Sequence, residues 1–219
     1  QGVEDELVTN YFDKLIQFPI RVPPLGTQEV RAYMMLLFIE NSDLQTDTKE
    51  ALRVGVCSQL GKTWQGKRVD LKFLRSLHDK LPDQLVARLD AADRLAPLMT
   101  TATGIAGNPR LIKRFLNALS IRMAMSRAQG VGVDESELAK VLLFERCGDP
   151  KAYAELIKSV TEADDGMPNF LVAWEQRAVA GEALDLKAPW DDAFIAEWLR
   201  LPPQLGASDL RGALYVSRE

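Results

Sequence analysis

Cysteine is scarce in this sequence, and no run of apolar residues is long. The two cysteines, Cys57 and Cys147, lie far apart and fit no metal-ligand spacing, which excludes a disulfide framework. We expect both to be small buried hydrophobic residues in a reducing cytoplasm. The longest apolar run, Ala32 to Ile39, is much shorter than the roughly 20 residues that a membrane-spanning helix needs. Since the start of the sequence shows no signal-peptide pattern either, a cytoplasmic location is expected.

Basic residues do not outnumber acidic ones. The sequence has 27 Lys or Arg against 31 Asp or Glu, a formal net charge of −4, with a pI near 5.3. This balance argues against broad electrostatic binding to nucleic acid, although it leaves room for a local basic patch. A composition of 47% hydrophobic and 26% charged residues is that of an ordinary globular protein, and 219 residues are enough for one large core or two small ones.

The sequence also lacks a phosphate-binding loop. Such a loop has the pattern Gly-x-x-x-x-Gly-Lys-Ser/Thr between a strand and a helix, and the one Gly-Lys-Thr here is Gly61-Lys62-Thr63. The preceding glycine, Gly55, is one residue too far away, and residues 54–60 are typical of the end of a helix. No apolar strand ends in paired acidic residues that could hold Mg²⁺. We therefore expect this chain alone not to hydrolyse a nucleotide.

The most informative stretch is residues 107–117, Gly-Asn-Pro-Arg-Leu-Ile-Lys-Arg-Phe-Leu-Asn. Asn108 can cap a helix, and Pro109 suits its first position because proline has a preset φ and needs no N–H partner there. Apolar residues then recur at spacings of three and four and predict one buried stripe: Leu111, Ile112, Phe115, Leu116, Leu119 and Met123. The opposite side of the helix carries four polar residues: Arg110, Lys113, Arg114 and Asn117.

Three of these polar residues, Arg110, Lys113 and Arg114, are cations within the first two turns. Cations are favoured at the negative C-terminal end of a helix and slightly disfavoured at its N-terminus, so their position needs another reason. Exposed backbone N–H groups beside Arg and Lys make a good phosphate site, to which we also assign Asn108 at the cap. The alternative is a solvated polar face on a core helix, and spacing alone leaves both interpretations open.

The rest of the sequence is mainly helical. A helix over residues 3–16 leads into the only convincing strand, Gln17–Val22, which Pro23-Pro24 ends. A lone strand lacks partners, so we expect a sheet whose other strands precede residue 1. Further helices are expected over residues 27–39, 47–60, 70–78, 109–129, 151–160 and 169–179. A long helix should begin at residue 82, with a kink or break at Pro97. Other helices should follow a cap at Asp134, begin after Asp191-Asp192, and extend over residues 209–216 with Ser208 as the cap.

Three blocks of the sequence resemble KAP-type P-loop NTPases. Residues 107–117 look like the signature that follows the catalytic core of this family. Residues 11–25, Tyr-Phe-Asp-Lys-Leu-Ile-Gln-Phe-Pro-Ile-Arg-Val-Pro-Pro-Leu, resemble the passage from a helix into the last core strand and out toward the lid. Residues 209–218, with Trp190 and Trp198 upstream, form the third block. The blocks follow the order of the family and span nearly the whole chain.

The resemblance implies an NTPase related to the AAA+ and STAND groups, and therefore ATP and Mg²⁺ as ligands of the whole protein. In such proteins a helical lid offers a basic "sensor 2" residue to the terminal phosphates of the nucleotide. By position, Arg110 is the first choice for that role, and Lys113 and Arg114 are next. Which of the three contacts phosphate is not decided by the sequence.

The fold class implied is mainly α: a helical lid or bundle with one short strand that belongs to a truncated α/β core. We divide the chain into residues 1–25, the end of the NTPase core; residues 26–148, the helical lid; and residues 149–219, a C-terminal helical extension. We expect Trp190 and Trp198 to pin this extension to a core rather than to form a ligand platform, because each buries a large area.

Several functions remain open at this stage. Soluble bacterial members of the family include ATPases of anti-phage defence systems, such as the Qat type, which work with partner proteins, and the resemblance favours that context. The alternative is a non-catalytic helical scaffold for protein–protein interactions, because no catalytic element is visible in the sequence. Nucleic-acid binding through the basic face of residues 109–129 is a third, weaker hypothesis. The sequence does not decide whether the protein is a homo-oligomer.

Overall fold

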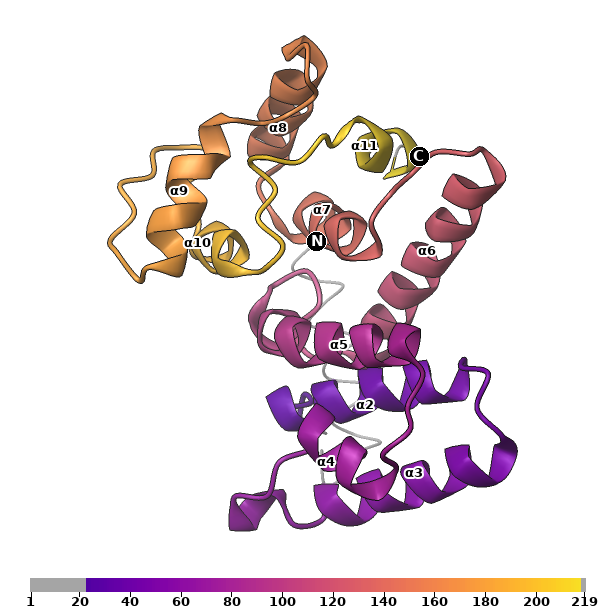
Figure 1. Cartoon of the computed structure of the whole chain (residues 1–219). Coiled ribbons are helices and arrows are strands. Elements are labelled where there is room, and N and C mark those ends of the chain that lie inside the picture. Colours follow the sequence, from indigo (N-terminus) through magenta and orange to yellow (C-terminus); the bar gives the residue numbers. More distant parts are fainter. Residues whose placement is uncertain (1–22, 218–219) are drawn as a thin grey trace, which may run out of the picture.

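Residues 23–217 are the part of the chain that the computed structural model describes. They form ten α-helices, α2 to α11, one short 3₁₀ helix, η1, and no strand (Figure 1). The mainly α class predicted from the sequence is thereby confirmed. The predicted helix over residues 3–16 and the predicted strand Gln17–Val22 lie outside the described residues.

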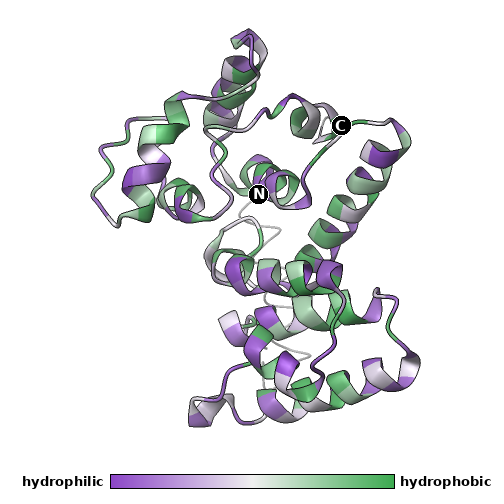
Figure 2. Ribbon diagram, viewed as in Figure 1, coloured by the Kyte–Doolittle hydropathy of each residue, from purple (hydrophilic) through white to green (hydrophobic). Residues whose placement is uncertain are grey.

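The first group of helices occupies the lower half of Figure 1. It consists of α2 (Thr27–Glu40), α3 (Thr46–Leu60), η1 (Thr63–Gln65), α4 (Leu71–Leu77) and α5 (Asp83–Thr101). The most extensive packing is between α2 and α5, while α3 packs on α2 and α4 packs on both α3 and α5. Figure 2 shows hydrophobic and hydrophilic residues alternating along these helices, as expected for helices that bury one side.

Pro97 does not end α5, so of the kink or break predicted from the sequence the break is wrong. The helix continues through Pro97 to Thr101, although an interior proline costs about 3 kcal/mol because it removes a backbone hydrogen bond. The residues on both sides of Pro97 are buried: Leu95, Ala96, Leu98 and Met99. Packing of this apolar side therefore outweighs the local preference of proline.

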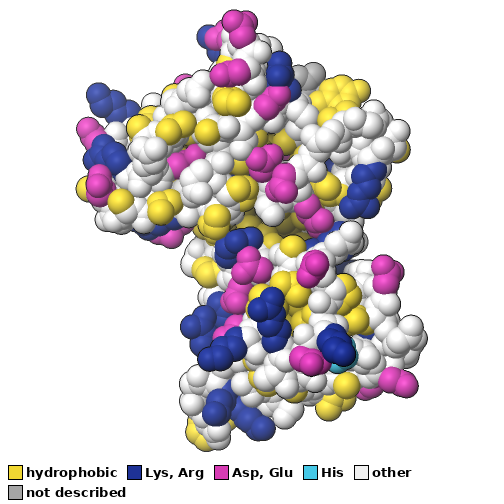
Figure 3. Space-filling view, viewed as in Figure 1, with side chains coloured by type: hydrophobic (Ala, Val, Ile, Leu, Met, Phe, Trp, Pro, Cys, Tyr) yellow, Lys and Arg dark blue, Asp and Glu magenta, His cyan; other side chains and the backbone are white. Residues whose placement is uncertain are grey.

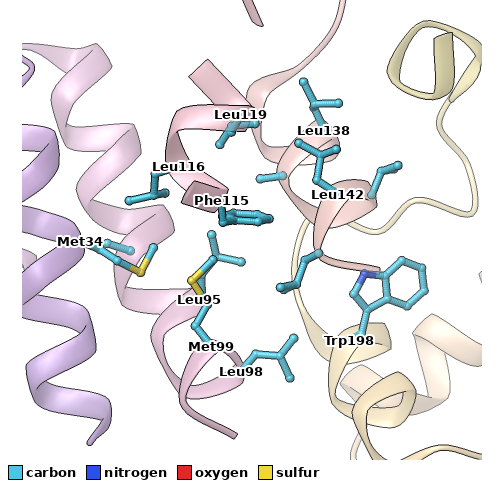
Figure 4. Packing of buried hydrophobic residues seen from close by; sticks show 14 of the residues in the cluster. Met34, Leu95, Leu98, Met99, Phe115, Leu116, Leu119, Leu138, Leu142 and Trp198 are labelled. Atoms are coloured by element: carbon cyan, nitrogen blue, oxygen red, sulfur yellow. The ribbon is translucent and has the colours of Figure 1, made fainter. Parts of the chain in front are cut away.

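Two long helices connect the first group to the rest of the chain. α6 (Pro109–Ala128) and α7 (Glu135–Cys147) pack against each other, and α6 also contacts α2. Figure 4 shows Phe115 and Leu116 of α6 between Met34 on α2 and Leu142 on α7. One hydrophobic core therefore runs without interruption from the first group to α7.

The last four helices gather around α7. They are α8 (Pro150–Glu162), α9 (Phe170–Val179), α10 (Ala193–Arg200) and α11 (Arg211–Ser217). α8, α10 and α11 contact α7 directly, and α9 packs on α10. In Figure 1 these helices form the upper half of the molecule, and α6 runs along its side. α7 therefore packs against α6 and against the later helices.

Three helix starts agree with the predicted caps, and the start near Ser208 does not. The side chains of Asn108, Asp134 and Asp192 each accept a hydrogen bond from a backbone N–H of the first turn. The cap predicted at Ser208 is wrong: α11 begins at Arg211, and it is Asp209 that accepts the Arg211 N–H at 3.0 Å. Ser208 instead belongs to a turn in which its N–H donates to the carbonyl oxygen of Leu205 at 3.0 Å.

The prediction that both cysteines are buried is also wrong. Cys57 is exposed and Cys147 is half-buried, and both are free thiols. The reason lies in α3, which buries only a narrow stripe, Leu52 and Val56, and leaves Cys57 outside it.

Candidate functional site

The site begins at the start of α6, where the backbone makes a tight turn. Gly107 has a φ of +65°, and a Cβ at this position would lie 2.4 Å from the carbonyl oxygen of Leu25. Glycine is therefore required both by the left-handed backbone and by the close approach. Asn108 then accepts the Arg110 N–H at 3.0 Å through its side-chain oxygen, and Pro109 occupies the first helical position. The N-terminal end of α6 thus lies beside the segment that leads into α2.

The two sides of α6 differ as the sequence predicts. Five of the six stripe residues are buried, Ile112, Phe115, Leu116, Leu119 and Met123, and the sixth, Leu111, is half-buried. Arg110, Lys113, Arg114 and Asn117 are all exposed. At 100° per residue, these four side chains fall within an arc of about 100°. The structure therefore brings these four polar residues onto one exposed side of the helix, and Asn108 lies at its cap.

The three cations on this side have no acidic partner among the described residues. Neither Arg110, Lys113 nor Arg114 forms an ion pair within residues 23–217. Farther along the same helix, Arg122 lies 3.4 Å from a carboxylate oxygen of Glu145 on α7. The helix therefore pairs a cation in its middle but leaves those of its first turns available, at the end where its dipole favours an anion.

Arg114 also takes part in a second feature that the sequence analysis missed. It lines a hollow of about 420 Å³ between α6 and α7, together with Arg122, Arg146 and Glu145. Arg122 lies two turns beyond Arg114, so the spacing of four and eight residues along α6 could have indicated it. Arg146 comes from α7 and could not be placed beside Arg114 by any local pattern. The basic side of α6 thus extends toward α7.

A buried ion pair forms a different polar cluster in the upper half of the molecule. Lys140 of α7 and Glu175 of α9 are both 1% exposed, and Lys140 Nζ lies 2.9 Å from Glu175 Oε1. The ammonium also donates to the carbonyl oxygens of Leu201 (2.6 Å) and Pro203 (2.8 Å). Burial lowers the pKa of Lys140 below its ordinary value, and Glu175 opposes this effect by favouring the charged form.

The carboxylate of this pair is equally well bonded. Glu175 Oε1 accepts the N–H of Leu205, and Oε2 accepts the N–H of Gly206, each at 2.8 Å. Because every strong hydrogen-bonding group of the pair has a partner in the protein, the cluster has a structural role: it fastens residues 201–206 to α7 and α9. Neither helical periodicity nor the composition of either segment indicated it.

The aromatic residues of this half are structural as well. Trp198 is fully buried, stacks on Phe144 with ring centroids 4.3 Å apart, and donates its indole N–H to the carbonyl oxygen of Lys140 at 2.8 Å. Trp190 is 4% exposed and donates to Glu155 at 2.7 Å. The prediction that these tryptophans pin the last segment to a core is confirmed.

Gly61-Lys62-Thr63 does not form a phosphate-binding loop. Gly61 is the residue that ends α3, and Thr63 begins η1. A phosphate-binding loop precedes a long helix and follows a strand, whereas this segment follows a helix. The rejection of this motif on spacing is therefore confirmed by its position.

Two further observations concern metal binding and membrane-spanning helices. Among residues 23–217, no group of three or more His, Cys, Asp or Glu side chains is arranged to hold a metal ion. In the same residues, no helix combines the length and the apolar character needed to cross a membrane.

Comparison with known proteins identifies the class to which this arrangement belongs. Residues 1–125 match the family model described as the KAP family P-loop domain. The match covers more than half of the 219 residues and defines a P-loop NTPase domain. The chain belongs to the KAP family. No curated protein and no solved structure matches it.

The match has a defined extent along the fold. It ends within α6, so it includes the cap at Asn108 and the exposed cations of the first turns. α7 to α11 lie beyond it, and so does the third block of resemblance, residues 209–218.

Proposed function

We propose that α2–α7 form the lid of a KAP-type ATPase and that Arg110 contacts the terminal phosphates of ATP. The observation that carries this proposal is the position of Arg110, Lys113 and Arg114: three exposed cations without an acidic partner among the described residues, on the first turns of a capped helix. If this side of the helix only faced solvent, acidic side chains would be more stable here than basic ones, because the helix dipole favours negative charge at the N-terminus. Cations at this position are explained if a phosphate lies between them and the backbone N–H groups.

Arg110 is the best placed of the three cations. It is the second residue of α6, in the first turn of the helix, and its guanidinium can bind two phosphate oxygens at once. Lys113 is one turn farther and offers a single ammonium. Arg114 lies beside Arg146 in the hollow between α6 and α7 and is therefore suited to an anion shared by two helices.

The chemistry of this contact couples nucleotide state to movement. Phosphoryl transfer spreads negative charge over the oxygens of the terminal phosphate, which an arginine stabilises. Because Arg110 belongs to the lid and the phosphate-binding loop belongs to the core, the contact exists only when lid and core meet around ATP. Loss of the terminal phosphate removes the contact and releases the lid.

The basic side of α6 can bind the phosphates of ATP, and we assign the binding of Mg²⁺ to residues of the core. The basic side of α6 suits a phosphate chain, and Mg²⁺, when bound beside it, supplies charge neutralisation to the phosphates. We assign the protein ligands of Mg²⁺ to the core, as the family resemblance implies.

The biological setting follows from the resemblance alone. We propose a cytoplasmic ATPase of a bacterial anti-phage defence system of the Qat type, acting with partner proteins. We further propose that residues 149–219 form an extension of the lid that takes part in those contacts, either with a partner or with a second copy.

The test is ATP turnover and ATP binding by the full-length protein, comparing wild type with Arg110→Ala. We expect turnover to fall by about 100-fold, the typical loss when one charge-stabilising donor is removed from a transition state. The matched control is Arg127→Ala, which removes the same side chain from the last turn of α6, where it is also exposed. Arg110→Lys should recover only part of the loss, because an ammonium cannot bind two oxygens in one plane.

Two results would contradict the proposal. Turnover that is unchanged in Arg110→Ala would move the contact to Lys113 or Arg114, whose alanine variants are measured in parallel. A full-length protein that binds no nucleotide would favour the scaffold function instead. The structure offers that function a groove of about 730 Å³ between α5 and α10, lined by Leu98, Phe194 and Leu201 among others.

A further inference from the structure

The turn between α3 and α4 carries an unusual combination of side chains. Trp64 lies on η1 and is 81% exposed, the most exposed of the large hydrophobic residues described. Residues 61–75 carry five Lys or Arg and a single Asp, a net charge of +4 within a chain of formal net charge −4. We call this surface the basic tip and define it by Trp64 and the five cations: Lys62, Lys67, Arg68, Lys72 and Arg75.

The cations of the basic tip are all exposed, and none forms an ion pair within residues 23–217. The one acid of the segment, Asp70, is engaged in capping α4, where it accepts the Phe73 N–H at 2.8 Å. In Figure 3, Lys and Arg side chains gather at the lower left of the molecule, where Figure 1 places α4 and the turn before it. The basic tip is therefore a local positive field on an acidic protein.

The backbone holds Trp64 in this exposed position. The N–H of Gln65 donates to the carbonyl oxygen of Lys62 at 3.0 Å, and the N–H of Gly66 donates to the carbonyl oxygen of Thr63 at 2.9 Å. Gly66 closes the turn with a φ of +79°. The side chain of Gln59 donates to the carbonyl oxygen of Arg68 at 3.2 Å and so ties the two ends together. The indole is thus presented on a hydrogen-bonded turn, so little backbone freedom is lost when it binds a partner.

We propose that the basic tip binds single-stranded nucleic acid, with Trp64 stacking on a base and the cations contacting phosphates. An aromatic face beside a basic track is the combination that binds single strands without sequence preference. A bilayer is less well suited, because the sequence neighbours of Trp64, Thr63 and Gln65, are polar, and one indole buries little apolar area. This surface is separate from the start of α6, so the proposal is independent of the ATPase function.

The test is fluorescence anisotropy of a labelled oligothymidylate of about 16 nucleotides, the upper range of sites bound by a single module. We expect binding that weakens with salt: the slope of log K against log salt should be about −2 to −3.5, as for three to five phosphates. Lys67→Ala/Arg68→Ala should reduce the steepness of this slope by about 1.4. Trp64→Ala should weaken binding by about 10-fold, the typical loss of one stacked base.

Matched controls separate this surface from others. Tyr215→Ala removes another exposed aromatic residue, and Lys151→Ala/Lys187→Ala removes two exposed cations from the upper half; neither should change the affinity. Tryptophan fluorescence gives a second readout, because Trp190 and Trp198 are buried and Trp174 is half-buried on α9. The oligonucleotide should quench the emission of Trp64, and the quenching should disappear in Trp64→Ala.

Three outcomes would overturn the proposal. The first is a wild-type protein that does not bind the oligonucleotide, including one that binds only vesicles containing phosphatidylserine. The second is binding that Trp64→Ala and Lys67→Ala/Arg68→Ala leave unchanged. The third is binding that is lost in Arg110→Ala/Arg114→Ala but kept in the tip variants, which would place the nucleic acid on α6.

Discussion

The neighbouring helices α6 and α7 differ in whether their cations are exposed or buried. On α7, Lys140 is buried, and its ammonium donates to one carboxylate and two carbonyl oxygens. On α6, Arg110, Lys113 and Arg114 are exposed and have no acidic partner among the described residues. Burial of an unpaired charge is costly, so a buried cation must be fully bonded, whereas an exposed one is free to bind a ligand. The difference distinguishes the residue that holds the structure together from those available for function.

The largest expected effect comes from Glu175→Gln. The substitution leaves Lys140 without a counter-charge and turns one acceptor of the Leu205 and Gly206 N–H groups into a donor. We expect the free energy of unfolding to fall by about 3–5 kcal/mol, measured by urea denaturation. The matched control is Glu197→Gln, which removes a carboxylate from an exposed pair with Arg200 and should cost less than about 1 kcal/mol. Equal losses for the two variants would mean that the buried pair contributes no more than a surface one.

A smaller effect is expected for the two cysteines, one of which is exposed and the other half-buried. Burial raises the pKa of the Cys147 thiol to about 11, although the neighbouring Arg146 opposes the shift. At neutral pH the reactive thiolate of Cys147 is therefore about 100-fold or more scarcer than that of an ordinary cysteine. We expect a maleimide at neutral pH to modify the exposed Cys57 faster than the half-buried Cys147, as measured by mass spectrometry of the Cys57→Ser and Cys147→Ser variants. Similar rates would show that α7 opens readily from its neighbours.

The smallest effect is expected where function is proposed. Arg110→Ala, Lys113→Ala and Arg114→Ala should each change the free energy of unfolding by less than about 0.5 kcal/mol, and in the stabilising direction at low salt, because each removes a cation from a helix N-terminus. Asn108→Ala at the same end should instead cost about 1 kcal/mol, since it removes the cap. A loss above 1 kcal/mol for any of the three cations would indicate that its role is structural.

Sequence reasoning was accurate where the structure depends on near neighbours along the chain. The cap at Asn108, the buried stripe from Ile112 to Met123 and the exposed cations of α6 all follow from spacings of three and four residues, which a helix places on one side. The KAP family was also evident from short motifs, and the family match over residues 1–125 agrees with it.

It was less accurate where packing opposes a local preference or joins distant residues. Pro97 lies inside α5 because the apolar residues around it are buried against neighbouring helices. Arg146 lies beside Arg114 because α7 packs on α6. The exposure of Trp64 depends on the position of its turn between α3 and α4.

The sequence by itself thus determined the mainly helical class, the cap at Asn108, the two sides of α6 and the family, because each is encoded in contiguous residues. Only the tertiary structure decided which charged residues are buried together. Lys140 and Glu175 are 35 residues apart, and their pairing depends on how α7, α9 and residues 201–206 pack. Such a contact has no local signature, since its stability comes from removing water around groups that meet only in the folded protein.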